Sequence, residues 1–307
     1  MSTIEWTGKT WNPVVGCTKV SEGCRNCYAE KMSRRMAAIA DDTVNRGLPP
    51  TVKMNAYTRV VKYKNDYPLA QWSNRVVCIE ESLKIPMEVR KPTTWFVNSM
   101  SDLFHPDVPF DFIDKIFDTM AQCQQHRFQI LTKRPERMAE YAYGINTNLI
   151  WHDQPWPLPN VWLGTSVENQ ETADERIPHL LKCPAAVRFL SCEPLLDPIP
   201  RLPLNGIGLA IVGGESGPGA RPFNLDWARS IREQCGAAGV PFYMKQLGAK
   251  PHDGLFNYTP DADEYGAPSF RERWLKLKSR KGNDMDEWPA DLRVREMPDV
   301  KKSKGGE

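Results

Sequence analysis

Three of the eight cysteines lie within one short segment near the start of the chain. Cys17, Cys24 and Cys27 have the spacing C-x6-C-x2-C, whereas the other five cysteines are scattered from Cys78 to Cys235. Thiolates grouped so closely can bind one soft metal centre, and their chemistry suits zinc or an iron–sulfur cluster. We therefore interpret the segment as a metal-binding loop and the five scattered cysteines as reduced, buried thiols.

The residues around this loop favour an iron–sulfur cluster over zinc. A structural zinc site usually has four Cys or His ligands, and the first histidine of the chain is His105. A [4Fe–4S] cluster held by three cysteines leaves one iron with an open coordination position. An open iron can bind a small molecule, which a cluster that only carries electrons does not need to do.

A second group of reactive side chains follows the ends of predicted strands. Its members fall at the same stage of successive repeats: Asp102, Lys133, Glu168, Glu193, Glu215 and Lys245. The polarity of β/α loops in general would explain part of this pattern. Within the group, the candidate catalytic residues for acid–base chemistry are Glu168, Glu193 and Lys133.

Short apolar strands alternating with amphipathic helices must position these side chains. The apolar pattern predicts a first strand near 11–15 and further strands at 94–97, 127–131, 161–163, 187–190, 209–212 and 241–244. It predicts helices at 28–40, 110–124, 136–143, 171–181 and 225–238. Such alternation indicates a parallel sheet covered by helices.

The predicted fold is α/β, a complete or partial (β/α) barrel of about six to seven parallel strands. A Rossmann sheet is disfavoured because no G-x-G-x-x-G follows the first strand. Barrel enzymes build their active sites at the C-terminal ends of the strands, where the reactive side chains are expected here. We predict a barrel domain over 1–246 with an insertion at about 41–92, a short irregular C-terminal extension over 247–300 and a disordered tail over 301–307.

Composition and charge limit the class of protein. The 307 residues carry 40 Lys and Arg against 38 Asp and Glu, a formal net charge of +2, so a nucleic-acid-binding surface must be local. The chain has no apolar run of about 18 residues, the length that spans a membrane. Its first residues lack the features of a signal peptide. We therefore expect a cytoplasmic protein with no membrane partner.

The cysteine loop, placed between a first strand and a helix, resembles the cluster-binding loop of radical S-adenosylmethionine (SAM) enzymes. The usual spacing in that superfamily is C-x3-C-x2-C, and an aromatic residue usually stands where this chain has Asn26. The resemblance implies a radical-SAM-like barrel with a [4Fe–4S] cluster on Cys17, Cys24 and Cys27. It also implies SAM as a cofactor and an electron donor such as flavodoxin or ferredoxin.

A closer resemblance covers about residues 4 to 250. It rests on seven segments: WNP at 11–13, GCT-x4-GC-x-NCYA at 16–29, NSMSDLFH at 98–105, LTKRP at 131–135, NVWLGTSVEN at 160–169, RFLSCEPLL at 188–196 and GGESG at 213–217. Together they resemble an uncharacterised family of phage-borne and bacterial proteins marked by a three-cysteine motif. That resemblance implies an iron–sulfur protein and brings no established reaction.

Two segments are candidates for binding SAM. Gly213-Gly214-Glu215 is similar to the Gly-Gly-Glu stretch that holds the amino group of SAM in radical SAM proteins, although it follows a later strand than usual. Ser99 and Asp102 follow the second regular strand and could supply the acceptors that an ammonium group needs. The alternatives are a tight turn or an anion-binding nest at 213–219 and capping of the following helix by Ser99 and Asp102.

Cations at strand ends indicate an anionic substrate. Lys133, Arg134, Lys245 and Gln246 are the candidate substrate-binding residues, because cations at the mouth of a barrel could hold a nucleotide phosphate. Pairing with neighbouring carboxylates is the alternative. The segment 271–281 (RERWLKLKSRK) combines cations with a tryptophan, a mixture that binds nucleic-acid strands, although a solvated surface is the more common outcome.

The leading hypothesis is an enzyme that cleaves SAM reductively and uses the 5′-deoxyadenosyl radical to modify or repair a nucleic acid or nucleotide. One alternative is a nucleic-acid-binding or interaction protein whose cysteines hold a metal for structure only. Another is a metal-dependent barrel hydrolase that uses Asp102, Glu168 and Glu193.

Overall fold

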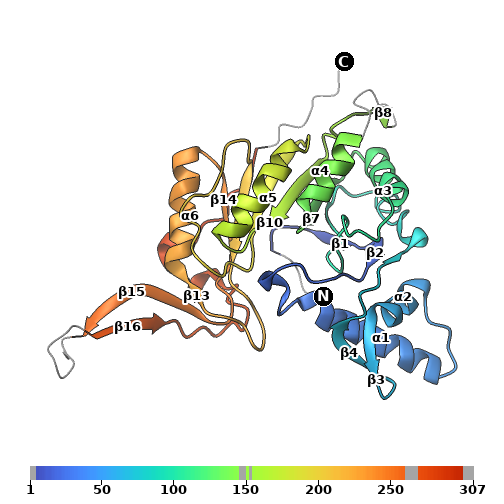
Figure 1. The fold of residues 1–307 in the computed structure, drawn as a ribbon, viewed down its shortest axis with the longest axis horizontal. Helices are drawn as coiled ribbons and strands as arrows, with labels where there is room; N and C mark the ends of the chain where they lie inside the picture. Colours follow the sequence, from blue (N-terminus) through green and yellow to red (C-terminus); the bar gives the residue numbers. More distant parts are fainter. Residues whose placement is uncertain (1–4, 145–149, 152–153, 260–268, 300–307) are drawn as a thin grey trace. The chain divides into compact units, whose positions relative to one another are not determined.

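The computed structural model describes residues 5–144, 150–151, 154–259 and 269–299 (Figure 1). The chain divides into two compact units: 1–167 with 171–188, and 168–170 with 189–307. The domain limit predicted at residue 246 therefore lies inside the second unit. The predicted disordered tail over 301–307 lies outside the described residues.

Four parallel strands form the sheet of the first unit. In spatial order they are β1 (Lys9–Trp11), β6 (Thr94–Val97), β7 (Arg127–Thr132) and β10 (Val161–Ser166). Trp11 is opposite Val97, and Val97 is opposite Ile130, so the three strands end close to one level. The side chains at this level are buried, and the residues that follow each strand are brought to one edge of the sheet.

Three amphipathic helices connect or follow these strands. They are α3 (Phe110–Gln122), α4 (Pro135–Gly144) and α5 (Gln170–Lys182). The helix α3 buries Phe112, Ile113, Ile116 and Phe117, apolar residues spaced along one face as the sequence predicts. The observed bounds of all three helices lie within two residues of the predicted ones.

The insertion and the preceding helix form a small apolar subassembly. It contains α1 (Tyr28–Asn45), α2 (Val52–Val60), the hairpin of β3 (Val61–Lys64) and β4 (Tyr67–Trp72), and the pair of β2 (Val14–Val15) with β5 (Val77–Cys78). Its apolar residues, including Val15, Ala37, Tyr57, Val60 and Trp72, pack into one cluster. The sequence analysis predicts the helix at 28–40 but marks 41–92 only as an insertion, because α2 and the hairpin have weak apolar periodicity.

The second unit repeats the parallel arrangement. Its strands are β11 (Val187–Cys192), which begins at the boundary between the units, β12 (Leu209–Gly213) and β14 (Phe242–Gln246), with α6 (Leu225–Ala238) between the last two. Asn224 caps the start of α6, and Gly239 ends the helix in a left-handed conformation.

The C-terminal extension is more regular than predicted. The strand β15 (Pro251–Thr259) pairs with β16 (Ser269–Trp274) as an antiparallel hairpin and with β13 (Phe223–Asn224) in parallel (Figure 1). These segments mix polar and apolar residues without regular alternation, so the sequence pattern does not predict the strands. The remaining short elements are β8 (Ile150–Trp151), β9 (Gln154–Pro155), η1 (Glu22–Cys24), η2 (Glu80–Ser82), η3 (Met285–Glu287) and η4 (Ala290–Leu292).

The observed sheets confirm an α/β fold with seven parallel strands, four in the first unit and three in the second. In each unit the parallel strands lie in chain order, without the reversal at the centre of a Rossmann sheet. This progression is the one found in (β/α) barrels. Among the described helices, none is long and apolar enough to cross a membrane.

Candidate functional site

The cysteine loop is anchored to the segment that follows β6. The backbone N–H of Gly16 donates to the carbonyl of Met100 at 3.2 Å. The side chain of Asn12 accepts from the N–H of Met100 at 3.0 Å and from the hydroxyl of Ser99 at 3.1 Å. These contacts fix the start of the cysteine loop beside the ends of β1 and β6.

The turn into the loop requires a glycine at position 16. Gly16 has φ +90°, a conformation that side chains disfavour, and a Cβ there would overlap the carbonyl oxygen of Arg75 and lie 2.8 Å from Val60 Cγ1. We expect Gly16→Ala to lower the free energy of unfolding by about 1–2 kcal/mol through backbone strain and by about 1–3 kcal/mol through overpacking. Urea unfolding measures the loss.

Gly47→Ala is the matched control for that substitution. Gly47 also has a left-handed φ, +73°, but a Cβ there meets nothing within 4 Å. The control should show the strain contribution alone. Equal losses in the two variants would mean that the close packing at residue 16 does not hold the loop.

The three cysteines are half-buried. Burial, together with the charges of Asp102 and Cys27, raises the pKa of Cys17 to about 12, although the charge and hydrogen bond of Arg134 act in the opposite direction. Burial likewise raises the pKa of Cys27; the N–H groups of Glu30 and Ala29 oppose this rise, and the charge of Cys24 adds to it. The loop thus gathers the three predicted ligands in one region.

Two of the three thiols have apolar surroundings. Cys17 and Cys27 pack against the apolar cluster of α1 and the insertion, which would shield a bound cluster from water on that side. In the described part of the chain, no group of three or more His, Cys, Asp or Glu residues is arranged to hold a single metal ion. Each cysteine of a [4Fe–4S] cluster binds a different iron, so its ligands need not converge on one point.

A buried carboxylate fixes the loop against α1 and β4. Glu30 accepts a hydrogen bond from the backbone N–H of Trp72 at 3.0 Å. Its other carboxylate oxygen lies 2.9 Å from Nζ of Lys19, which belongs to the cysteine loop. One side chain thereby connects the loop, the helix that follows it and the hairpin of the insertion.

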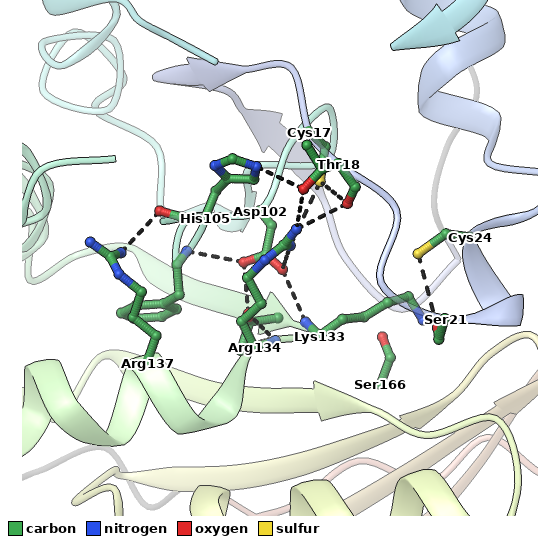
Figure 2. Close-up of polar contacts among 12 residues, drawn as sticks. Cys17, Thr18, Ser21, Cys24, Asp102, His105, Lys133, Arg134, Arg137 and Ser166 are labelled. Carbon is green, nitrogen blue, oxygen red and sulfur yellow. Dashed lines mark hydrogen bonds and ion pairs between the residues drawn. The ribbon is translucent and has the colours of Figure 1, made fainter. Parts of the chain in front are cut away.

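Arg134 connects the end of β7 to the same loop (Figure 2). One guanidinium nitrogen donates to Asp102 Oδ2 at 2.9 Å and to Cys17 Sγ at 3.8 Å. The other donates to both the carbonyl and the hydroxyl of Thr18 at 2.9 Å. The Arg134 side chain is only 10% exposed, so the guanidinium is held in place beside the first cysteine.

Asp102 lies at the centre of these contacts. Its Oδ1 accepts from the hydroxyl of Thr132 at 2.7 Å and from the N–H of Phe104 at 3.0 Å. Its Oδ2 accepts from the N–H of Lys133 at 3.1 Å and from Arg134. The carboxylate is therefore occupied by four internal donors, each at the end of a parallel strand or in the segment that follows one.

His105 supports the loop from the other side of Thr18. Its Nδ1 accepts from the N–H of Asp107 at 3.1 Å, so Nε2 carries the proton and donates to the Thr18 hydroxyl at 2.9 Å. Burial and the charge of Arg134 lower the pKa of His105. Lys133 extends its side chain toward Ser21 and Cys24 (Figure 2).

In the second unit, Glu193 and Lys245 form an ion pair of 3.0 Å. The hydroxyl of Ser191 donates to the same oxygen of Glu193 at 3.3 Å. The other carboxylate oxygen of Glu193, Oε1, is buried without a hydrogen-bond partner among the described residues. A Cβ at Gly213 would lie 2.8 Å from that oxygen, so the glycine leaves room for the carboxylate.

The remaining predicted residues of this unit are also engaged internally. Glu215 binds Arg221 through both carboxylate oxygens, and Gln246 donates to the carbonyl of Gly214 at 2.8 Å. The backbone carbonyl of the buried Glu168 accepts from Leu196. All of these partners belong to the second unit, and the contacts do not indicate a ligand for these residues.

The structure therefore gathers the predicted residues in two groups. The first unit brings together Cys17, Cys24, Cys27, Asp102, Lys133 and Arg134, with Ser99 bound to Asn12; the second brings Glu193 to Lys245 beside Gly213. The sequence analysis missed Thr18, His105 and Thr132. Their signals were proximity to predicted residues and a place within the segments that carry the family resemblance, but a Thr or His in a loop has many ordinary roles.

Comparisons with known proteins identify a family. No curated protein and no solved structure matches the chain. A family model described as "Protein of unknown function (DUF5131)" matches residues 1–298. The match confirms the resemblance to a family without an established reaction, and the chain belongs to the DUF5131 family.

Proposed function

We propose that the protein is a radical-SAM-like iron–sulfur enzyme that acts on a nucleic acid or nucleotide. Cys17, Cys24 and Cys27 would hold a [4Fe–4S] cluster, and SAM would bind its fourth iron. One electron from flavodoxin or ferredoxin would break the C5′–S bond of SAM, leaving methionine and a 5′-deoxyadenosyl radical that takes a hydrogen atom from the substrate.

The gathering of three half-buried thiols in one anchored loop carries this proposal. The loop lies between β1, the first strand of the parallel sheet, and α1, with the short strand β2 directly before it. The radical SAM resemblance implies a position between a first strand and a helix. Apolar side chains back two of the cysteines, and a guanidinium N–H points at the sulfur of one of them. Both features favour a bound cluster over free thiols exposed to solvent.

The predicted acceptors for the SAM ammonium group fit less well. Asp102 already accepts from four donors, and Glu215 is held by Arg221. Ser99 donates its hydroxyl proton to Asn12. SAM binding through these side chains would require exchange of internal partners, so support for SAM comes from the cysteine motif and not from the acceptors.

An exposed basic segment supports the nucleic-acid part of the proposal. Trp274 is 49% exposed and lies beside His252, with the two rings tilted by 39° at a centroid distance of 5.0 Å. Exposed cations lie on either side of it in sequence: Arg273, Lys276, Lys278, Arg280 and Lys281. An accessible aromatic ring among cations can bind a single strand by stacking and by charge. Arg134 and Lys245 contribute less, since each is paired with a carboxylate.

Anaerobic reconstitution followed by addition of SAM tests the proposed activity. Reduced protein should contain about four irons per chain, change its electron paramagnetic resonance spectrum when SAM is added, and release 5′-deoxyadenosine. A stoichiometric zinc without iron, or a cluster whose spectrum SAM leaves unchanged, contradicts the proposal. The second of these results would favour the alternative of a structural metal in an interaction protein.

The substrate class is tested in the same preparation. Single-stranded DNA or RNA should stimulate 5′-deoxyadenosine release, and its affinity should fall with salt as expected for phosphate contacts. Trp274→Ala should weaken binding by roughly 1–3 kcal/mol. Lack of binding to either nucleic acid at low salt would exclude this substrate class.

The hydrolase alternative receives less support from the contacts. A divalent metal would need Asp102, Glu168 and Glu193 as ligands, but Asp102 and Glu193 are ion-paired with Arg134 and Lys245. Such pairing satisfies the carboxylates without a metal. Activity that survives loss of all three clustered cysteines would nevertheless favour a hydrolase.

A further inference from the structure

We infer that Arg134 and Asp102 form an opposed charge pair that sets the reduction potential of the cluster through Cys17. This inference rests on the proposed iron–sulfur function and assigns the two residues a positioning and tuning role. The cysteine motif identifies the ligands of the cluster but does not determine its reduction potential.

The geometry of Arg134 gives it direct access to the ligand. Its guanidinium nitrogen lies 3.8 Å from Cys17 Sγ, within the range of an N–H···S hydrogen bond. Thr18 and Asp102 supply three further acceptors at 2.9 Å, which hold the group in one orientation. Because the side chain is 90% buried, water screens its charge only weakly.

A donor at this position favours the reduced state. Reduction adds one negative charge that the cluster shares with its cysteine sulfurs. Hydrogen bonds to those sulfurs and nearby positive charge stabilise the added electron, and both are known determinants of cluster potential. Arg134 supplies both, so it should raise the potential.

Asp102 should act in the opposite direction. Its carboxylate is 2.9 Å from the same guanidinium nitrogen and is itself buried, with 8% of its side chain exposed. Its negative charge partly cancels that of Arg134 and disfavours the added electron. Removing either member of the pair should therefore shift the potential, and the two shifts should differ in sign.

The test compares midpoint potentials in reconstituted full-length protein, measured by redox titration with electron paramagnetic resonance detection. Arg134→Gln should decrease the ratio of reduced to oxidised cluster at a fixed potential at least tenfold, which is 59 mV for one electron. Arg134→Lys keeps the charge without the forked donors and should give a smaller decrease. Asp102→Asn should increase the ratio.

Arg137→Gln is the control. Arg137 lies in the first turn of α4, three residues after Arg134, and donates to the backbone carbonyl of His105 at 3.0 Å (Figure 2). It also donates to the carbonyl of Val108 at 2.8 Å. Its shift should be much smaller than that of Arg134→Gln, since it makes no hydrogen bond to a cysteine. Iron and sulfide content should match the wild type in each variant that is compared.

Several results would overturn the inference. Equal shifts in Arg134→Gln and Arg137→Gln, or shifts of the same sign in Arg134→Gln and Asp102→Asn, would leave no tuning role for the pair. If wild type assembles a cluster but none of the Arg134 and Asp102 variants does, the pair serves assembly and the inference is rejected. Absence of a cluster from wild type instead rejects the proposed function itself.

Discussion

Replacing Cys17, Cys24 or Cys27 by Ala should reduce iron from about four per chain to near zero after anaerobic reconstitution. Each thiol is expected to bind a different iron, and the loop offers three clustered cysteines with no histidine near them in the sequence. With one of only three protein ligands removed, the two remaining cysteines should not retain the cluster. Iron and sulfide analysis with the visible absorption spectrum measures the loss.

Cys123→Ala is the matched control for these three variants. Cys123 is buried at the end of α3 in the same unit and lies outside the cysteine loop. It should retain the full iron content even if the smaller side chain lowers stability slightly. Full retention of iron by all three loop variants would contradict the assignment of the ligands, as would loss of iron by the Cys123 variant alone.

Asp102→Ala should destabilise the first unit by about 3–5 kcal/mol, because removal of one partner leaves the buried charge of Arg134 unpaired. The substitution also leaves the Thr132 hydroxyl and the N–H groups of Phe104 and Lys133 without their acceptor. The effect should be present in the metal-free protein. Urea unfolding, followed by far-UV circular dichroism, measures it.

Asp107→Ala separates this effect from a general effect of removing a carboxylate. Asp107 is five residues further along the same segment, its side chain is 61% exposed, and it lies 3.8 Å from His105. An exposed carboxylate contributes little, so the variant should unfold close to wild type. If Asp102→Ala is as stable as the wild type but no longer binds SAM, Asp102 acts as a SAM contact, as the sequence predicts, and its structural role is contradicted.

The regular part of the fold was predictable because its signals are local. Apolar runs bounded by turns marked the parallel strands after the first, and residues 94–97 and 225–238 were predicted with the observed bounds. The first strand, predicted near 11–15, is observed at 9–11, because Val14–Val15 pair with β5 instead. Spacing alone identified the cysteine loop, since three thiols within so few residues have few ordinary explanations. Arg134 and Asp102 were found for the same reason, as charged residues directly after strands.

The insertion and the C-terminal hairpin were not predictable in the same way. The helix α2 and the strands β3, β4, β15 and β16 have weak apolar periodicity. The first three pack into the apolar cluster of the insertion, and β15 pairs with β16. The sequence could mark residues 41–92 only as an interruption. The structure shows that this segment contributes apolar residues to the cluster against which Cys17 and Cys27 pack.

The sequence by itself determined the parallel α/β architecture, the three clustered thiols and the family to which the chain belongs. Only the tertiary structure decided the partners of the charged residues. It bound Arg134 to Asp102 and Cys17, where the sequence suggested a substrate phosphate, and it bound Lys245 to Glu193. The physical reason is that strand periodicity and thiol spacing are local properties, whereas an ion pair depends on which strand ends meet.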